Sequence, residues 1–275
     1  MLAIGMELRV EQFRALLGNP RPVVLGTIIH SLTFPSLAIA AVVALFLLDV
    51  SLAEATVLGV LLVAACPSGG FSNILTSMAR ANLTLSVVLT AISSLLSFAT
   101  VPLLLSSFGF FVTELSTSIE LPVTQILLQL TVLILFPLLV GMLLAKRFIW
   151  ITPTRVSVLQ KYTQLILYIT VALMIVESWQ IMVAGFVQAL PWSIGLCAGN
   201  IIICYWLARK AKFTNEDAIT VCLEGSIRNL GVAFLIAANT LERVDIAVLP
   251  TVYFLTVLVI SILFAKNWQK LPGFN

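Results

Sequence analysis

A short stretch inside a long apolar segment carries two charges that could do chemistry. Cys222–Asn229 contains Glu224 and Arg228, and Gly225 weakens any helix between them. A charged side chain near the centre of a bilayer costs at least about 2.5–3.5 kcal/mol. The stretch therefore predicts a site for an ion or a polar solute. The alternative is a self-neutralising structural pair, because residues four apart on a continuous helix share one face.

A second apolar segment places oxygen-bearing side chains beside a predicted helix break. The run from Cys66 to Asn73 contains a proline and two adjacent glycines, so the helix is expected to break at mid-membrane. Carboxylate, amide and hydroxyl oxygens together suit a small hard cation such as sodium. Ser86 and Thr90 share one helix face, although such a pair alone more often serves helix packing. The predicted sodium ligands are Ser72, Asn73, Ser86, Thr90 and Glu224.

The composition is that of a polytopic helical membrane protein. Of 275 residues, 60% are hydrophobic and 10% are charged, whereas soluble domains contain about 25% charged residues. We expect one transmembrane domain over 1–275, with about eight full spans after a partial helix at 1–6, each span long enough for ~30 Å of hydrocarbon. The spans are predicted at 22–48, 52–79, 83–110, 122–145, 162–184, 190–208, 217–240 and 246–265.

The loops between these spans alternate in charge. Every Lys and Arg except Arg228 and Arg243 falls on one side, while the other side carries acidic residues and an uncharged turn near Ala184. The positive-inside rule makes the basic side cytoplasmic. The sequence thus predicts a multi-pass protein of the cell (inner) membrane with a cytoplasmic C-terminus. Basic residues serve topology here, so the lipid bilayer is an expected partner and nucleic acid is not.

The single histidine and the cysteines offer no enzymatic arrangement. His30 lies mid-span, where a lone histidine more often packs as a hydrogen-bonding residue than carries protons, which is the alternative. No nucleophile triad, phosphate-binding loop or metal-ligand spacing occurs. We therefore expect neither an enzyme nor a cofactor other than a coupling ion. Small buried hydrophobes are the expected role of Cys66, Cys197, Cys204 and Cys222.

The two interrupted spans occupy corresponding places in two halves of the chain. Spans 52–79 and 217–240 are the second and the seventh, so they cross the membrane in opposite directions. Each is followed by a short turn and one more span. Paired interrupted helices are typical of inverted-repeat secondary transporters, whose ion and substrate sites lie where the breaks meet. The pattern predicts such a transporter with two crossed discontinuous helices.

Four stretches together resemble the bile acid:sodium symporter family. Pro67–Asn73 reads Pro-Ser-Gly-Gly-Phe-Ser-Asn and is similar to the family's Pro-Gly-Gly-Thr-Ala-Ser-Asn. Glu224–Asn229 reads Glu-Gly-Ser-Ile-Arg-Asn and is similar to Glu-Val-Gly-Met-Gln-Asn. Ile4–Phe13 and Arg21–Pro35 resemble the family's preceding turn and helix. The resemblance runs in order along essentially the whole chain.

This resemblance implies a fold and a sodium site. It implies two inverted five-helix repeats in which the first helix and most of the second are missing from this chain. The family's first sodium site carries over without substitution to the five oxygen-bearing residues above. The second does not, because the two glutamines that it uses are His30 and Arg228 here, and a guanidinium accepts no hydrogen bond. The implied parts are core helices at about 22–110 and 190–265 and panel helices at about 1–8 and 122–184.

Our hypothesis is that the fixed charge of Arg228 replaces the second sodium, so that transport couples to one sodium ion or to none. The resemblance implies an organic anion as substrate: a bile acid-like molecule, a steroid sulfate or a small carboxylate. One alternative is a proton-coupled or uncoupled carrier of the same fold. Another is a non-transporting sensor or degenerate paralogue in which Glu224 and Arg228 form a locked pair. The implied substrate-binding residues are Gly70, Phe71, Arg228 and Asn229.

Overall fold

The protein is built of helices that are long and apolar enough to cross a membrane. The computed structural model describes residues 1–8, 20–50, 52–106, 123–148 and 150–270. Within that part of the chain, six helices have the length and composition of membrane spans. They are α3 (Arg21–Leu47), α6 (Leu83–Ser106), the rod of α8 (Val123–Leu130), a π-helical turn (Thr131–Leu135) and α9 (Phe136–Arg147), then α10 (Pro153–Glu177), α11 (Trp179–Lys210) and α14 (Val248–Asn267). The chain is an all-α polytopic membrane protein, as its composition predicts.

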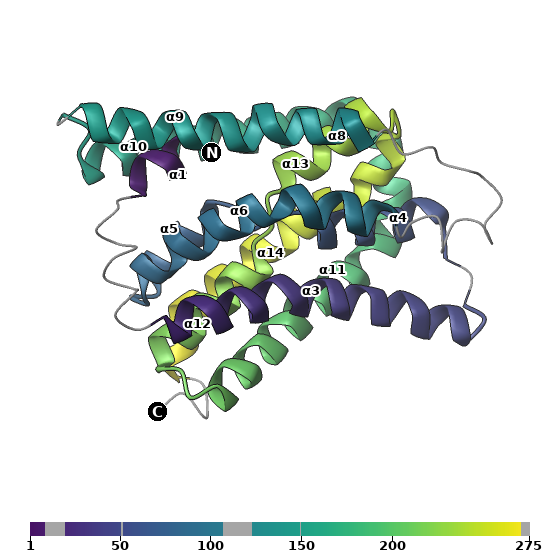
Figure 1. Ribbon diagram of the computed structural model, residues 1–275. Coiled ribbons are helices and arrows are strands. Elements are labelled where there is room, and N and C mark those ends of the chain that lie inside the picture. Colours follow the sequence, from purple (N-terminus) through teal and green to yellow (C-terminus); the bar gives the residue numbers. More distant parts are fainter. Residues whose placement is uncertain (9–19, 51, 107–122, 149, 271–275) are drawn as a thin grey trace.

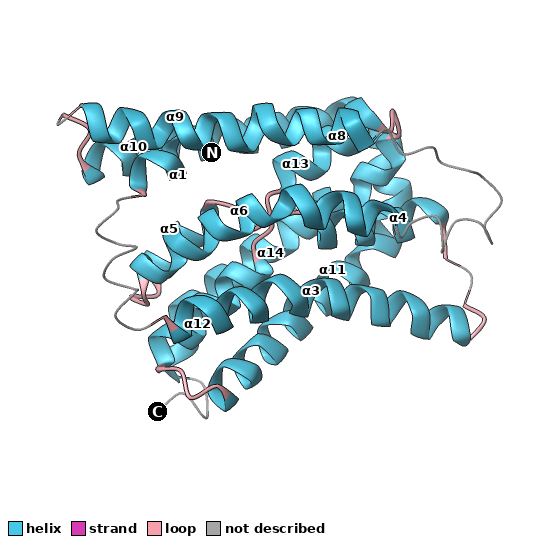
Figure 2. Ribbon diagram, viewed as in Figure 1, coloured by secondary structure: helices cyan, strands magenta, loops and turns pink. Residues whose placement is uncertain are grey.

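Two further apolar spans are each split into a pair of short helices. The interruptions lie at residues 66–70 and 227–229, and Figure 2 draws both as loop within the helical bundle. The first contains the proline and the two glycines, and the second follows Gly225 closely. Both predicted breaks are confirmed. The four short helices are α4 (Glu54–Ala65), α5 (Phe71–Met78), α12 (Asn215–Ser226) and α13 (Leu230–Leu235).

The two breaks cross and exchange backbone hydrogen bonds. The Gly69 N–H donates to Ile227 O at 2.9 Å, and the Asn229 N–H donates to Pro67 O at 2.8 Å. The approach requires glycine, because a Cβ on Gly69 would lie 2.9 Å from Arg228 O. Backbone groups released by one break are thus satisfied by the other, which a lipid environment demands.

The helices are arranged as a flanking layer and a central bundle. The flanking layer, at the top of Figure 1, consists of α1 (Leu2–Glu7), α8, α9 and α10, and the central bundle contains α3–α6 and α11–α14. Two glycines bring α1 and α9 into backbone contact. A Cβ on Gly5 would lie 2.1 Å from Leu138 O, and one on Gly141 would lie 2.2 Å from Leu2 O. The assignment of these two groups to panel and core domains stays a prediction.

One turn lies elsewhere than the sequence predicts. α10 ends at Glu177 and the turn lies at Ser178, so Ala184 is inside α11 and the prediction of a turn there is wrong. Pro191 lies at the predicted start of the next span, but α11 continues through it. Membrane helices tolerate such a proline where neighbouring groups satisfy the released carbonyl. Outside the described residues lie 9–13 of the N-terminal motif and 107–110 and 122 of the predicted spans.

Candidate cation site and adjoining cavity

Glu224 lies near the end of α12, and its side chain is fully buried. Three hydroxyl groups surround its carboxylate. Ser72 Oγ lies 2.6 Å from Oε1, Thr90 Oγ1 lies 2.9 Å from Oε2, and Ser86 Oγ donates to Oε1. Ser72 comes from the first turn of α5, directly after the break, whereas Ser86 and Thr90 lie one turn apart on α6. Polar groups rather than lipid therefore surround this charge.

Asn73 completes the set of predicted sodium ligands. Its Oδ1 accepts hydrogen bonds from Ser86 Oγ at 2.8 Å and from Thr90 Oγ1 at 3.3 Å. Asn73 is 2% exposed and the other four residues are 0% exposed. The structure thus brings all five together in one buried cluster, which we call the oxygen cluster: Ser72, Asn73, Ser86, Thr90 and Glu224.

The oxygen cluster has more acceptor atoms than hydrogens to fill them. Each hydroxyl carries one hydrogen, yet each lies within bonding distance of at least two acceptors. Ser72 Oγ, for example, also lies 2.8 Å from Gly69 O, and Thr90 Oγ1 lies 3.1 Å from the second carboxylate oxygen of Glu224. A small cation resolves such a surplus of oxygen ligands and also offsets the buried charge. The donor set fits sodium.

Side chains hold the C-terminal end of α12 in place. Ser68 Oγ donates to Glu224 O at 2.9 Å, and Tyr253 Oη donates to Ser226 O at 2.5 Å. Asn200 Nδ2 donates to Ser226 Oγ at 3.1 Å. The last carbonyls of a helix have no partner within it, so these contacts satisfy them and fix the position of the carboxylate. They come from the other break, α14 and α11.

Arg228 does not pair with Glu224. Its guanidinium donates to Cys66 O at 3.2 Å and to His30 O at 3.3 Å, and it lies 4.5 Å from the centre of the Phe34 ring. Among the described residues the ion pairs involve Arg243 instead. α12 ends before residue 227, so the one-face geometry of a continuous helix is lost. The self-neutralising pair that the spacing allowed does not form in this structure.

The guanidinium lies at the C-terminal end of a half-helix. Cys66 is the residue that caps α4, and its free carbonyl accepts the Arg228 bond. A helix C-terminus carries partial negative charge and attracts cations, so a fixed cation stands at an end where a mobile one could bind. His30 is buried, with Nδ1 3.4 Å from Ser68 Oγ and without a contact to the oxygen cluster.

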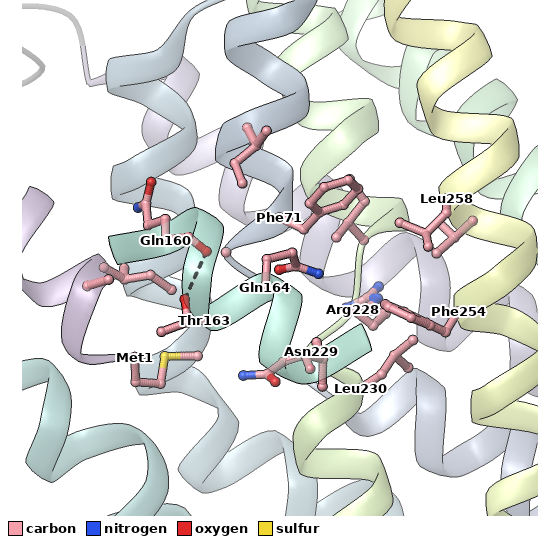
Figure 3. Close-up of a pocket in the computed structure, with 18 residues that line it drawn as sticks. Met1, Phe71, Gln160, Thr163, Gln164, Arg228, Asn229, Leu230, Phe254 and Leu258 are labelled. Carbon is pink, nitrogen blue, oxygen red and sulfur yellow. Dashed lines mark hydrogen bonds between the residues drawn. The ribbon is translucent and has the colours of Figure 1, made fainter. Parts of the chain in front are cut away.

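A cavity of about 170 Å³ lies between the breaks and the flanking layer (Figure 3). All four residues implied for substrate binding line it, namely Gly70, Phe71, Arg228 and Asn229. The opposite wall comes from α10, and α14 contributes Phe254 and Leu258. The cavity and the oxygen cluster share the first residues of α5, because Phe71 lines the cavity and Ser72 contacts Glu224.

Sequence reasoning missed the polar residues that α10 presents to this cavity. Gln160, Thr163 and Gln164 line it, and Gln164 Nε2 is buried without a hydrogen-bond partner among the described residues. Arg228 Nε, on the other wall, is also buried without one. The spacing 160, 163, 164 puts three polar side chains on one face of a membrane helix, and this is the signal that could have found them. Glu7, which bonds Asn73 and Gln160, was missed as well.

Comparison with known sequences places the chain among transport proteins. The sequence model of the sodium bile acid symporter family matches residues 1–185. The probable sodium/metabolite cotransporter BASS2, chloroplastic, of Oryza sativa subsp. japonica is 26% identical over 250 residues, which is 90% of this chain and 57% of that protein. The uncharacterized sodium-dependent transporter YocS of Bacillus subtilis is 33% identical over 150 residues, 54% of this chain and 43% of that protein.

The match to a third relative extends along nearly the whole chain. The probable sodium/metabolite cotransporter BASS1, chloroplastic, of rice is 25% identical over 283 residues, covering 99% of this chain and 64% of that protein. The chain spans about half the length of the curated relatives it matches. The family match covers most of the chain and includes the first break with four of the five cluster residues. The chain belongs to the sodium bile acid symporter family.

Proposed function

We propose that this protein is a secondary transporter that carries a small organic monocarboxylate together with one sodium ion. The observation that carries the proposal is the oxygen cluster around Glu224 beside a cavity. Ser72 of the cluster directly follows Phe71 of the cavity wall, and the cavity is lined by residues with donors that lack a partner among the described residues. The family to which the chain belongs consists of transporters and not of enzymes. Two curated relatives are named as sodium/metabolite cotransporters, which supports the same reading.

The ligand of the cavity is proposed to be an anion. Within the described part of the chain, Arg228 Nε and Gln164 Nε2 are buried donors without hydrogen-bond partners, and both residues line the cavity. A buried donor left without an acceptor costs about 1–3 kcal/mol. A carboxylate offers several acceptor sites and so satisfies donors from both walls at once. Asn229, which also lines the cavity, adds an amide to the same surface.

The cavity volume favours a small acid over a steroid. Pockets that hold drug-sized ligands measure about 300–1,000 Å³, whereas this cavity measures about 170 Å³. Its apolar lining is aliphatic apart from Phe71 and Phe254, whose rings pack on Tyr168 behind them, with ring centres 6.5 Å and 5.5 Å away. These features suit a carboxylate with a short apolar body. Bile acid-like molecules and steroid sulfates are the less favoured members of the predicted class.

The sodium stoichiometry is proposed to be one. A second sodium near the breaks would lie close to the Arg228 guanidinium, and two unit positive charges 4 Å apart repel by about 4 kcal/mol at an effective dielectric near 20. Arg228 already occupies the carbonyl of Cys66 at the end of α4. Its charge stays with the protein, so one sodium ion and one monovalent anion cross together without moving net charge.

Coupling is proposed to run through the first break. Sodium in the oxygen cluster would hold Ser72 and Asn73 in fixed positions relative to Glu224, and these residues follow directly on Gly70 and Phe71 of the cavity wall. Ion binding would thereby order the surface that receives the anion. Alternating access would follow from movement of the flanking layer against the central bundle, as in other inverted-repeat carriers. The protein would lie in the inner membrane of the cell, and its basic loops would face the cytoplasm.

The test is uptake into proteoliposomes that contain the purified protein. Labelled monocarboxylates of about three to six carbon atoms and a sulfated steroid are offered with an inward sodium gradient or with potassium in its place. We expect sodium-dependent uptake of a small acid, loss of that uptake in Glu224→Gln, and no steroid uptake. Uptake at equal rates in potassium would contradict sodium coupling. Sodium-driven uptake of the steroid alone would contradict the proposed size limit.

A further inference from the structure

Glu7 links the oxygen cluster to the cavity wall through a single carboxylate oxygen. Its Oε2 accepts a hydrogen bond from Asn73 Nδ2 at 3.1 Å and another from Gln160 Nε2 at 2.7 Å. Asn73 belongs to the oxygen cluster, and Gln160 lines the cavity from α10. Glu7 itself is only partly buried and lies at the end of α1. No residue of the sodium or substrate site proposed above has this bridging position.

α1 packs tightly against α9 within the flanking layer. Gly5 and Gly141 let the backbones of α1 and α9 touch, so a side chain at either position would meet backbone atoms. Ile4 also packs on the first break, because a Cβ on Gly70 would lie 2.9 Å from its Cδ1. A displacement of the flanking layer therefore carries Glu7 with it. Whether Glu7 contacts Asn73 then depends on the position of that layer, so the cation site responds to movement of the layer.

The Glu7 contact determines which way the Asn73 amide faces. With Nδ2 directed at the carboxylate, Oδ1 faces Ser86 and Thr90 inside the cluster. The reverse orientation would set Oδ1 against a carboxylate oxygen and direct N–H groups at the cation, and both contacts are repulsive. Glu7 is thus a device for presenting an amide oxygen rather than an amide nitrogen to sodium. Metal sites use outer partners of their ligands in the same way.

We propose that Glu7 is a positioning residue that orients Asn73 as a sodium ligand and ties sodium occupancy to the flanking layer. This inference rests on the proposed sodium site. Glu7 is not a ligand itself, because the two groups that face its Oε2 are N–H donors. When sodium holds Asn73, the Asn73–Glu7–Gln160 chain holds α1 and α10 against the central bundle. This position of the flanking layer and sodium binding therefore favour each other. By linkage, the factor by which sodium stabilises the position equals the factor by which the position raises the affinity for sodium.

The experiment measures thermal stability of the purified full chain while sodium replaces potassium at constant ionic strength. We expect Glu7→Ala to raise the sodium concentration at half-maximal stabilisation by about 10–100-fold, the usual cost of removing an outer partner of a metal ligand. Glu7→Gln should raise it less, because its amide oxygen still accepts from Asn73. Glu177→Ala, at the exposed C-terminal end of α10, is the matched control and should leave the midpoint unchanged.

A double-variant cycle separates positioning from a merely structural role. In an Asn73→Ala background, Glu7→Ala should add no further change in the sodium midpoint, because the residue through which Glu7 acts is gone. A structural role alone would lower the melting temperature equally at every sodium concentration. An unchanged midpoint in Glu7→Ala overturns the proposal by itself, whereas the near-isosteric Glu7→Gln keeps the packing and an acceptor for Asn73 and should recover part of the loss.

The outcomes distinguish this inference from the function on which it rests. A native protein that responds to sodium, with Glu7 variants that respond identically, overturns the role of Glu7 and leaves the sodium site standing. A native protein stabilised equally by sodium and potassium overturns both. Shifted midpoints in the Glu7 variants, together with a silent Glu177→Ala, support both.

Discussion

At the scale of residues, the chemistry of this protein is concentrated in a few buried oxygen atoms. The carboxylate of Glu224 has three hydroxyl groups at hydrogen-bonding distance and, among the residues that the structure describes, no basic partner. A buried charge without a counter-charge is costly unless an ion accompanies it. The hydroxyls and the Asn73 amide add oxygen ligands without adding charge. This is the composition that a selective but reversible site for a monovalent cation requires.

Removing the charge of Glu224 while keeping its shape should abolish the sodium response. In Glu224→Gln, the amide oxygen still accepts from Ser72, so we expect the fold to persist. The melting temperature in potassium should not fall, because a buried uncompensated charge has been removed. It should no longer rise when sodium replaces potassium. A preserved sodium-dependent rise in melting temperature would show that the carboxylate is not the cation ligand.

Thr90→Val should weaken sodium binding without emptying the site. The hydroxyl contacts both carboxylate oxygens and the Asn73 amide, and valine has nearly the same shape. Loss of a hydrogen-bonded or ligating hydroxyl costs about 1–3 kcal/mol, which corresponds to roughly 5–150-fold in the sodium midpoint. Isothermal titration with sodium provides the measurement. Ser97→Ala on the same helix is the control, since that buried hydroxyl donates to Ser94 O, which lies outside the oxygen cluster.

At the scale of elements, the crossed breaks determine where the site lies. Two spans that approach from opposite sides lose their helical hydrogen bonds at the same depth and pair with each other there. The ends of four short helices therefore converge, with Ser72 and Glu224 in the oxygen cluster and Asn229 at the cavity. A continuous helix would instead have put Glu224 and Arg228 on one face. The breaks instead separate the two charges, so that Glu224 lies in the oxygen cluster and Arg228 lies at the end of α4.

Gly69→Ala should destabilise this crossing. The new methyl group would lie 2.9 Å from Arg228 O, at the backbone bridge, so the breaks must separate at a cost of about 1–3 kcal/mol. The change is measured by thermal unfolding. Unfolding is monitored through the labelling of the four buried free cysteines with a thiol-reactive dye. Gly195→Ala in α11 is the matched control, because its Cβ would meet nothing within 4 Å. Equal melting temperatures for the two variants would argue against a tight crossing.

At the scale of the whole molecule, a flanking layer faces a central bundle across the cavity. α10 and the breaks supply opposite walls, so any sliding of the layers changes the shape of the cavity. The fixed charge of Arg228 lies in the central bundle and, in the proposed transport cycle, does not leave with the transported anion. The number of charges that cross the membrane is therefore set by the mobile ions alone.

Transport by the native protein should be electroneutral. One sodium ion and one monovalent anion carry no net charge, so a potential imposed with potassium and valinomycin should leave the initial rate of sodium-driven uptake unchanged. The dependence of that rate on sodium concentration should have a Hill slope near one. A slope near two, or acceleration by an inside-negative potential, would mean that a second sodium ion is carried.

The double change His30→Gln and Arg228→Gln should raise the sodium stoichiometry. It removes the fixed cation from the end of α4 and supplies two amide oxygens near the breaks. We expect the Hill slope to rise toward two and uptake to become sensitive to membrane potential. Arg243→Gln is the control for loss of an arginine, because that residue pairs with Asp245 and Glu54 away from the site. No rise in slope would contradict the idea that Arg228 replaces an ion.

Much of this arrangement is legible in the sequence because it depends on local patterns. Apolar runs and charged turns predict the spans, and Pro67 with the adjacent glycines predicts a break, since each is a property of neighbouring residues. The five cluster residues follow from the family's motifs. The turn assigned near Ala184 is wrong: the chain turns at Ser178, between the polar residues Glu177 and Gln180, and Ala184 lies inside α11.

The sequence by itself determined that the chain crosses the membrane repeatedly, that two spans are interrupted, and that charges lie within them. Only the tertiary structure decided what those charges contact. Whether Glu224 met Arg228 or the hydroxyls of α5 and α6 depended on how the breaks cross, which involves residues more than a hundred positions apart. The role of Glu7 was hidden likewise, because packing of α1 on α9 brings it to Asn73 and Gln160. Hydropathy and helix breaking act along the chain, whereas ligand geometry arises from the packing of distant elements.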